Sequence, residues 1–379
     1  MSTDRMQSLA ALEAGQLTEI VRRAQASPGF EIGEWSVRHL SKDGMINPEG
    51  LFLVSGDGHD ERGPRCWSLV LKSINAASPE PDPSDPWHWK REYWALESGL
   101  LDRLPGPMAT PFCFGVALQP DGAWLWLEHV LDRSPRRWGT AEFVFAAEQL
   151  GRTTGAWLAS GMVLDYPWVC RGHARVWAEG FAPKDEMWAN EYVQRAWPPE
   201  LRERTLALWA ERERLSAALD RLPQTFAHFD SQRRNLMIRT RPDGRDELVA
   251  VDWGWCGWGP VGLDAAILIG NSMILVELEP AAVPELEAAA FPAYLDGLRA
   301  AGWQGNVDQV RLAYAAATAL FCGVSGPGLA ACFARPENDA WLQDNFGVDS
   351  AGAAEHCARL CEFGVSHGEE ALRLAERLF

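Results

Sequence analysis

A histidine, an aspartate and an asparagine lie close together in one polar stretch near the middle of the chain. The stretch "AHFDSQRRNLMI" places His228, Asp230 and Asn235 at the spacing HxDxxxxN, and Asp252 follows in "LVAVDWGWCGWG". Phosphoryl transfer needs a carboxylate that orients the acceptor hydroxyl and takes its proton, together with hard oxygen ligands that hold Mg²⁺ against nucleotide phosphates. The two aspartates and the asparagine supply these groups, so the pattern predicts phosphoryl-transfer chemistry.

A lysine inside an apolar strand is the second chemical signal. The stretch "CWSLVLKSI" is typical of a strand over 66–74, in which Leu69 and Leu71 face one way and Lys72 the other. An ammonium in such a strand is costly unless its charge is paired. Glu92, on the next predicted helix, is the expected partner, and the pair would hold the ammonium where it can meet α- and β-phosphate oxygens.

The elements that must position these groups divide into a sheet-rich first part and a helix-rich second part. In the first part we predict helices over 7–25 and 87–104, and strands over 35–40, 51–56, 66–74, 112–118 and 123–131. In the second part we predict helices over 141–160, 200–222, 280–301, 306–323 and 351–378, with a hairpin within 226–252. We therefore expect an α+β fold with a sheet-rich N-terminal lobe, residues 1–131, and a helix-rich C-terminal lobe, residues 132–379.

The bulk composition indicates a folded protein and disfavours nucleic acid as a partner. The chain has 379 residues, 47% hydrophobic content, 19 tryptophans and a formal net charge of -17. A strongly acidic chain lacks the basic field that nucleic-acid binding uses, so no nucleic-acid partner is expected. The acidity suits a cationic small substrate, but a charge that only keeps the chain in solution is the simpler explanation.

The cysteines and the N-terminus indicate where the protein resides. None of the eight cysteines forms a CxxC pair, which argues against zinc-finger and thioredoxin sites, and scattered thiols fit a reducing cytosol. The N-terminus lacks the long apolar segment of a signal peptide, and we find no run of about 18 apolar residues. We expect a cytoplasmic protein without a membrane span, and the sequence does not indicate its oligomeric state.

Together these patterns resemble the aminoglycoside phosphotransferase and choline kinase-like branch of the protein-kinase-like fold. The matching stretches are the catalytic-loop spacing in "HFDSQRRN", the "DW" with a downstream Gly and Asp in "VDWGWCGWGPVGLD", the strand lysine in "LVLK", the helix glutamate in "KREYWAL" and the hinge-like "LWLEHV". They span residues 35–265, roughly, and the last hundred or so residues fit this family only as a helical tail.

The resemblance implies a role for each matching residue. Asp230 is implied as the catalytic base, and Asn235 and Asp252 as the metal ligands. Lys72 is implied as the lysine that contacts the phosphates of ATP, with Glu92 as its ion-pair partner.

Three further roles follow from the same resemblance. Backbone groups from Glu128 to Val130 are implied to meet the adenine edge. His228 is expected to support its loop by hydrogen bonding, and Asp264 is expected to pin the loop that follows "DW".

The chain departs from the family in its phosphate loop. No GxGxxG lies between the first two strands, and "LSKDGMINPEG" holds only Gly44 and Gly50. The catalytic loop is rich in arginine, so either Arg233 or Arg234 is a candidate to approach the γ-phosphate, with exposure to solvent as the alternative for at least one of them.

These expectations predict a kinase that moves the γ-phosphoryl group of MgATP to a hydroxyl of an aminoglycoside, an amino sugar, a choline-like amine or another small metabolite. An acidic pocket would favour a cationic acceptor, with Glu277, Glu279 and Asp349 as candidate wall residues. No segment ending in APE follows Asp252, which disfavours a protein substrate. The alternative is a nucleotide-binding sensor or scaffold without turnover, and Asp230 argues against it because holding a nucleotide requires no base.

Overall fold

The computed structural model describes residues 14–40, 50–134 and 137–379, and contacts within the chain divide it into two compact units. The first unit consists of Met1–Arg103 and Ala109–Asp132, and the second of Leu104–Met108 and Arg133–Phe379. This division falls next to the lobe boundary that we placed after residue 131. The short segment Leu104–Met108 belongs to the second unit, although it precedes that boundary in the sequence.

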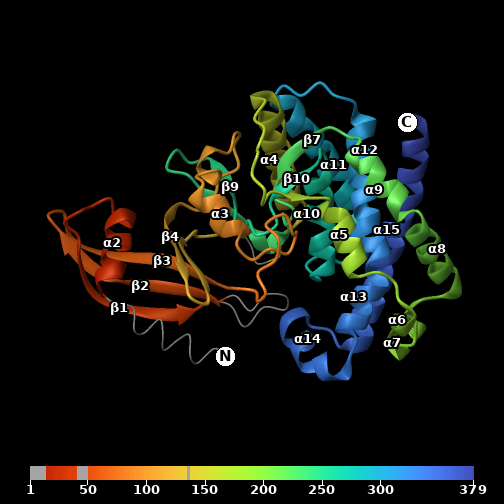
Figure 1. Ribbon diagram of the computed structural model, residues 1–379, viewed down its shortest axis with the longest axis horizontal. Coiled ribbons are helices and arrows are strands. Elements are labelled where there is room, and N and C mark those ends of the chain that lie inside the picture. The colour runs from red at the N-terminus through yellow and green to blue at the C-terminus, as the bar shows by residue number, and fades with distance from the viewer. Residues whose placement is uncertain (1–13, 41–49, 135–136) are drawn as a thin grey trace. The chain divides into compact units, whose positions relative to one another are not determined.

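The first unit is built on a five-stranded antiparallel sheet in the order β1-β2-β3-β5-β4. Its strands are β1 (Glu31–His39), β2 (Gly50–Asp60), β3 (Gly63–Asn75), β4 (Cys113–Gln119) and β5 (Gly122–Glu128), and its helical segments are α2 (Ala14–Ala24), α3 (Arg91–Glu97) and the 3₁₀ turn η1 (Leu101–Arg103). Figure 1 shows β1, β2 and β3 side by side with α2 lying against them. The predicted sheet-rich N-terminal part is confirmed. Residues 7–13 of the first predicted helix, and Gly44, lie outside the described residues.

The two faces of this sheet bury different side chains. On one face Leu69 of β3 packs in the same apolar cluster as Leu17 of α2. On the other face Leu125 of β5 packs with Tyr93, the residue after Glu92 in α3. Lys72 stands opposite Leu125 in the register of β3 and β5. Because strand residues alternate between faces, the lysine points to the face that α3 covers, as the sequence predicted.

The helix predicted over 87–104 is much shorter, because polar turns interrupt its apolar spacing. The α-helix covers only Arg91–Glu97. Before it, the Asp85 side chain accepts the Trp87 backbone N–H, which forms a turn. After it, Gly99 adopts a φ of 65°, a left-handed conformation that ends helices.

The second unit is mainly helical, with two small sheets. Its helices are α4 (Thr140–Ser160), α5 (His173–Gly180), α6 (Asp185–Trp188), α7 (Glu191–Ala196), α8 (Pro199–Ala210), α9 (Arg212–Asp220), α10 (Leu263–Ile274), α11 (Val283–Ala300), α12 (Val307–Thr318), α13 (Gly326–Phe333), α14 (Asp339–Phe346) and α15 (Ser350–Leu378). The shorter turns are η2 (Arg233–Asn235), η3 (Pro280–Ala282), the π-helical η4 (Ala319–Val324) and η5 (Pro336–Asn338). The strands β6 (Cys170–Arg171), β10 (Gly257–Pro260) and β7 (Gln224–Ala227) form one sheet in that order, and β8 (Leu236–Thr240) pairs with β9 (Asp246–Ala250).

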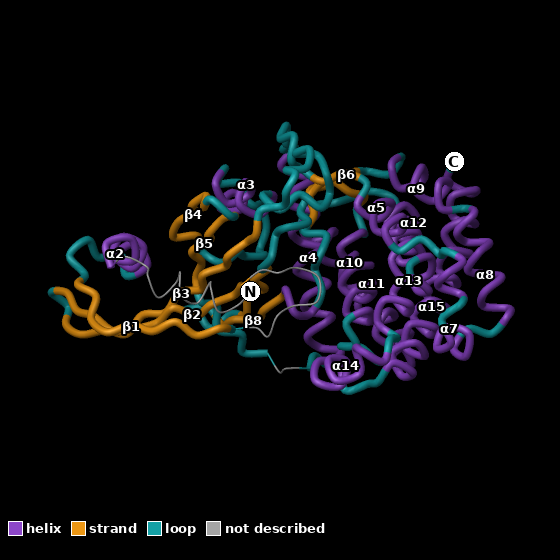
Figure 2. Tube along the Cα trace, turned by 60° about the horizontal axis from the view of Figure 1, so that its bottom comes forward, coloured by secondary structure: helices purple, strands orange, loops and turns teal. Residues whose placement is uncertain are grey.

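Helix α10 lies at the centre of this unit, next to α4 and α11 (Figure 2). All twelve of its residues are buried, polar ones included. The sequence patterns predict no helix here. They predict one helix over 200–222, which the structure divides at Glu211 into α8 and α9.

One continuous helical segment, Val307–Phe333, is long and apolar enough to cross a membrane by length and composition. In its most apolar stretch of 18 residues, 83% is buried inside the protein. It contacts α10 and α15 within the second unit. Its apolar composition is thus accounted for by packing in the core, and the absence of a membrane span stays a prediction.

Two glycines allow η4 and α15 to approach closely, and this contact predicts a large effect on stability. A Cβ atom on Gly364 would lie 2.1 Å from the backbone nitrogen of Gly323, which is too close for any carbon. We expect Gly364→Ala to lower the free energy of unfolding by about 1–3 kcal/mol, because one of the two buried backbones must shift. Urea unfolding monitored by tryptophan fluorescence measures it. Gly15→Ala in α2 is the control, since no described atom lies within 4 Å of that Cβ and no loss of stability is expected.

A half-buried ionic cluster joins α11, α12 and α15. Glu287 Oε1 accepts from Arg311 Nη1 at 2.5 Å and contacts His367 Nε2 at 3.1 Å, and Arg311 also pairs with Glu370. Burial disfavours the ionised Glu287, but the hydrogen bonds and charges of His367 and Arg311 outweigh it and hold the pKa of this carboxyl below its ordinary value of 4.5.

This cluster predicts a stability loss that depends on pH. A carboxyl whose pKa is lower in the folded state stabilises the fold above its unfolded pKa, and that stabilisation disappears as the pH falls through the folded pKa. We therefore expect Glu287→Gln to lower the free energy of unfolding by about 1–3 kcal/mol at pH 7, and by progressively less below its ordinary pKa of 4.5. Urea titrations across this range measure the difference. Glu355→Gln, at an exposed position on α15, is the control and should show neither effect. If Glu287→Gln lowers the free energy of unfolding equally at every pH, the ionised Glu287 does not stabilise the fold through this cluster.

Candidate active site

The stretch HxDxxxxN forms the connection between β7 and β8, and Asp264 of α10 holds its first half. The Asp264 carboxylate accepts the backbone N–H groups of His228 at 3.1 Å and Phe229 at 3.0 Å, and the Ser231 hydroxyl at 3.3 Å. Burial raises the pKa of Asp264, and these hydrogen bonds work in the opposite direction. From the sequence, Asp264 is expected to pin the loop after "DW". Its described hydrogen bonds go instead to the loop that contains Asp230.

Backbone conformation turns the predicted base out of the sheet. Phe229 has a φ of 62°, in the left-handed region that residues other than glycine seldom adopt. Its ring is fully buried against Gly259 of β10, where a Cβ atom would lie 2.6 Å from the ring. The packed ring fixes the strained backbone, so that the next residue, Asp230, leaves the strand direction.

His228 supports the loop by hydrogen bonding. Its Nδ1 accepts the backbone N–H of Asp230 at 3.1 Å, so the ring proton lies on Nε2, which donates to the Val251 carbonyl at 2.9 Å. The imidazole is fully buried and packs edge-on against Trp253. This one ring thus ties the Asp230 loop to the segment that leads into Asp252.

Asp230 and Asn235 are in direct contact. Asn235 Nδ2 donates to the backbone carbonyl of Asp230 at 3.0 Å and to the side-chain Oδ2 of Asp230 at 2.7 Å. The short turn η2 brings the two side chains together across five residues of sequence. Since the amide nitrogen is directed at Asp230, the amide oxygen is the Asn235 atom that can serve as a metal ligand.

Asp252 follows directly after the β8–β9 hairpin. The backbone N–H of Val251 donates to the Asn235 carbonyl at 2.9 Å, so the residues on either side of the hairpin are held together at its base. Asp252 itself has a φ of 63°. A left-handed aspartate at the end of a strand is a conformation that functional sites often retain.

Two residues of α10 that the sequence patterns did not identify also hold the loop. Asn271 Nδ2 donates to Asp230 Oδ1 at 3.2 Å, and Ser272 Oγ accepts the Arg233 backbone N–H at 3.2 Å. Together with Asp264 they stand at positions i, i+7 and i+8, which share one helix face. A polar side chain on an otherwise apolar, fully buried helix was the signal that would have identified them.

The two arginines of the loop have different environments. Arg233 is buried and stacks over Trp138, with its Cζ 4.8 Å from the ring centroid. Arg234 is exposed and pairs with Glu277 at 2.6 Å. The predicted alternative of solvent exposure thus holds for Arg234, and the buried guanidinium of Arg233 supports the loop from inside.

In the first unit, the predicted ion pair between the strand lysine and the helix glutamate is present. Lys72 Nζ lies 2.6 Å from Glu92 Oε2, and each side chain is only 4% exposed. A charge buried to this degree requires a partner of opposite sign. The pair is therefore a fixed part of the first unit.

The hinge-like stretch lies at the end of β5. The backbone N–H of Glu128 donates to the Phe112 carbonyl at 2.8 Å, and the Glu128 carboxylate accepts the Phe112 N–H at 3.1 Å. Val130 is buried two residues later, still within the first unit. Contact of this backbone with adenine stays a prediction.

Two of the three carboxylates proposed for a cationic acceptor already have partners. Glu277 pairs with Arg234. Asp349 caps α15 by accepting the Gly352 backbone N–H at 2.8 Å. Glu279 is exposed. Of the three, Glu279 alone thus remains as support for an acidic wall, and it is a surface residue.

Among the described residues, no three His, Cys, Asp or Glu side chains gather closely enough to form a metal site of their own. The predicted pair, Asn235 and Asp252, supplies one amide oxygen and one carboxylate. Mg²⁺ commonly takes one or two protein ligands and completes its shell with water and nucleotide phosphates. The donor set therefore fits a magnesium ion that arrives with a nucleotide.

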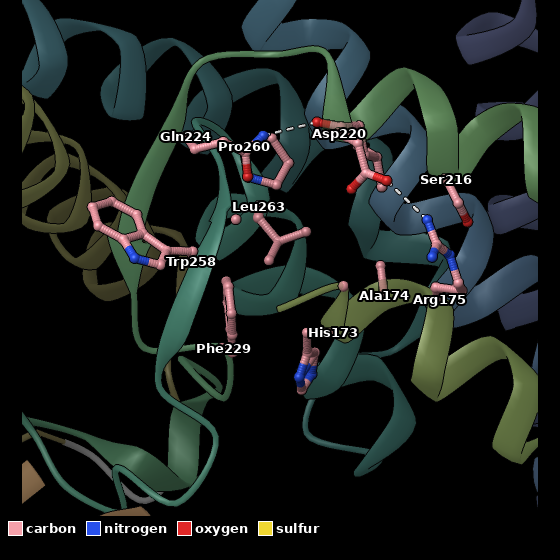
Figure 3. A pocket seen from close by; sticks show the side chains of 13 residues that line it. His173, Ala174, Arg175, Ser216, Asp220, Gln224, Phe229, Trp258, Pro260 and Leu263 are labelled. Atoms are coloured by element: carbon pink, nitrogen blue, oxygen red, sulfur yellow. Dashed lines mark hydrogen bonds and ion pairs between the residues drawn. The ribbon is translucent and has the colours of Figure 1, made fainter. Parts of the chain in front are cut away.

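A small cavity lies beside the Phe229 ring, lined by residues of α5, α9, β7, β10 and α10 (Figure 3). Its volume is about 20 Å³, and Trp258 and Leu263 line it beside Phe229. Arg175 and Asp220 form an ion pair at 2.8 Å along its wall. A cavity of this size holds about one water molecule, so it is too small for an acceptor.

Comparison with known families identifies the family of the chain. The family model described as the phosphotransferase enzyme family, APH, matches residues 87–303, more than half of the chain. The chain belongs to this family. No curated protein matches the sequence.

Solved structures of kinases are similar to this chain, and the first of the three described below shares its fold. A microcompartment-associated aminopropanol kinase matches with a TM-score of 0.52 and 12% identity, covering 94% of this chain and 98% of its own. The amicoumacin kinase hAmiN matches with a TM-score of 0.49 and 15% identity, covering 96% of each chain. An aminoglycoside phosphotransferase from Alicyclobacillus acidocaldarius matches with a TM-score of 0.47 and 15% identity, covering 92% and 93%. The α+β, protein-kinase-like fold expected from the sequence is confirmed.

Proposed function

We propose that this phosphotransferase is a small-molecule kinase that moves the γ-phosphoryl group of ATP to a hydroxyl of its acceptor. The observation that carries the proposal is the joined arrangement of Asp230 and Asn235, whose side chains lie 2.7 Å apart. A base and a metal ligand in direct contact suit a reaction in which the hydroxyl must be aligned with a metal-bound phosphate.

Asp230 is the group that we propose to contact the acceptor hydroxyl. Its carboxylate orients the hydroxyl for in-line attack and takes the proton as the bond to phosphorus forms. Asn235 and Asp264 hold the loop in place around it. Positioning of this kind accounts for much of the rate that such enzymes achieve, because the transferred group needs little covalent assistance.

Asn235 and Asp252 are the residues that would hold Mg²⁺. When bound, the ion neutralises the charge that develops on the β- and γ-phosphates. Lys72 would contact the α- and β-phosphates, and Glu92 would fix the direction of its ammonium. The backbone from Glu128 to Val130 would receive the adenine edge.

The acceptor is a small molecule with a hydroxyl group, and four classes stay open: aminoglycosides, other amino sugars, choline-like amines and further metabolites. A cationic acceptor is supported by the net charge of -17. It is not supported by Glu277 or Asp349, because both already have partners.

The test is transfer of label from [γ-³²P]ATP with Mg²⁺ to a panel that contains one compound of each class, followed by mass analysis of the labelled product. Transfer to the hydroxyl of at least one compound supports the kinase. Tight binding of ATP without transfer to any compound would favour the sensor or scaffold instead. Failure to bind ATP would contradict both.

A further inference from the structure

Both oxygens of the Asp230 carboxylate receive a hydrogen bond from a side-chain amide. Asn235 Nδ2 donates to Oδ2 at 2.7 Å, and Asn271 Nδ2 donates to Oδ1 at 3.2 Å. Asn235 belongs to the same loop as Asp230, whereas Asn271 reaches it from the buried helix α10. The carboxylate is thus held from two elements, and its orientation does not depend on the loop alone.

The environment of Asn271 gives no other reason for an amide at this position. The residue is 8% exposed, and its Oδ1 has no hydrogen-bond partner within the part of the chain that the structure describes. A buried carbonyl oxygen without a partner destabilises a fold. Rotating the amide would not help, because it would bring that oxygen against the Asp230 carboxylate. The amide is therefore oriented by Asp230, to which its nitrogen donates at 3.2 Å.

Ser272, the next residue on α10, has the hydrogen bonds expected of a residue with a purely structural role. Ser272 Oγ accepts the Arg233 backbone N–H at 3.2 Å and donates to the Leu268 carbonyl at 2.6 Å. Its hydroxyl is thus bonded in both directions, as is usual for a buried polar group. Asn271 differs, since among the described residues only the half of its amide that faces Asp230 has a hydrogen-bond partner.

We propose that Asn271 is a positioning residue, which fixes the direction of the Asp230 carboxylate for the acceptor hydroxyl. The inference rests on the proposed function, because it gives Asp230 the role of base. With Asn271 in place, Oδ1 and Oδ2 are each oriented by an N–H group, and the carboxylate needs no rearrangement when the acceptor arrives. Without it, Oδ1 loses this donor while Asn235 still holds Oδ2, so the direction of the carboxylate is fixed less firmly.

The test compares activity with stability in Asn271→Leu, a substitution of similar size without hydrogen-bonding groups. We expect kcat for phosphoryl transfer to fall roughly 10- to 100-fold, as for loss of one hydrogen bond to a charged group. We expect the affinity for AMP-PNP with Mg²⁺ to be unchanged, because Asn235 and Asp252 are intact. The melting temperature should change little, because loss of the hydrogen bond to Asp230 is offset by removal of a buried carbonyl that has no partner among the described residues. Asn271→Ala removes the same amide without adding methyl groups and should lower kcat to a similar extent.

Ser272→Ala is the matched control one position along the same helix. It should lower the melting temperature and lower kcat less than Asn271→Leu. Wild-type kcat in both Asn271 variants would overturn the inference, as would a loss of kcat accompanied by a lower melting temperature and weaker nucleotide binding. If the wild-type protein transfers phosphate to no acceptor at all, the proposed function fails instead, so the two failures are distinguishable.

Discussion

Asp230→Asn should reduce kcat for phosphoryl transfer roughly 10²- to 10⁴-fold, the range found when a positioned general base is removed. An asparagine keeps the size of the side chain but cannot take the hydroxyl proton. Its neutral amide also gives Asn235 and Asn271 a weaker acceptor than the carboxylate they contact at 2.7 Å and 3.2 Å. Initial rates with [γ-³²P]ATP at saturating acceptor measure the effect.

Two measurements separate loss of the base from loss of the fold. The affinity of Asp230→Asn for AMP-PNP with Mg²⁺ should stay within a few-fold of wild type, because the proposed phosphate and metal contacts are intact. Asp243→Asn makes the same change of charge in the exposed turn between β8 and β9, and it should leave kcat unaltered. A variant at Asp230 that still transfers phosphate at the wild-type rate would remove this residue from the mechanism.

The second large effect concerns the buried pair of the first unit. Lys72→Met removes the ammonium that lies 2.6 Å from Glu92. Glu92 is only 3% exposed, so its carboxylate stays buried after the ammonium is lost. We expect two losses. The free energy of unfolding should fall by about 3–5 kcal/mol, as when one partner of a buried ion pair is removed. The value of kcat/KM for ATP should fall about 10²- to 10³-fold, because the proposed donor to the phosphates is lost.

The double variant Lys72→Met with Glu92→Leu separates these two losses. Replacing both charges with apolar side chains also removes the carboxylate that has lost its ammonium, so most of the stability should return. The phosphate contact does not return, so kcat/KM for ATP should remain at the level of the single variant. Recovery of activity together with stability would show that the pair serves only the fold, and the proposed phosphate contact would then be wrong.

Patterns with a local physical cause were predictable from the sequence. Runs of strand-forming residues between turns predicted all five strands of the first sheet, and alternation within β3 predicted that Lys72 and Leu71 face opposite ways. The cost of an isolated ammonium in an apolar strand was enough to predict the contact between Lys72 and Glu92. The spacing of Asp230 and Asn235 likewise predicted that one loop would present both side chains.

The residues that support the base were not predictable in the same way. Helix α10 is buried on all sides, so its sequence lacks the period of 3.6 that marks an amphipathic helix. Asn271 is 41 residues from Asp230, and only the folded chain brings the two together. The acidic residues were misjudged for a related reason: Glu277 is neutralised by Arg234 from a distant segment, which no local pattern reveals.

The most direct test of the proposed mechanism is a crystal structure of the protein with AMP-PNP and Mn²⁺, in which anomalous scattering locates the metal. We expect a metal ion bound by Asn235 Oδ1 and the Asp252 carboxylate, with Lys72 Nζ on the α- or β-phosphate and Asp230 outside the metal's coordination shell. A metal held by other residues, with Asp252 turned away from it, would contradict the central claim.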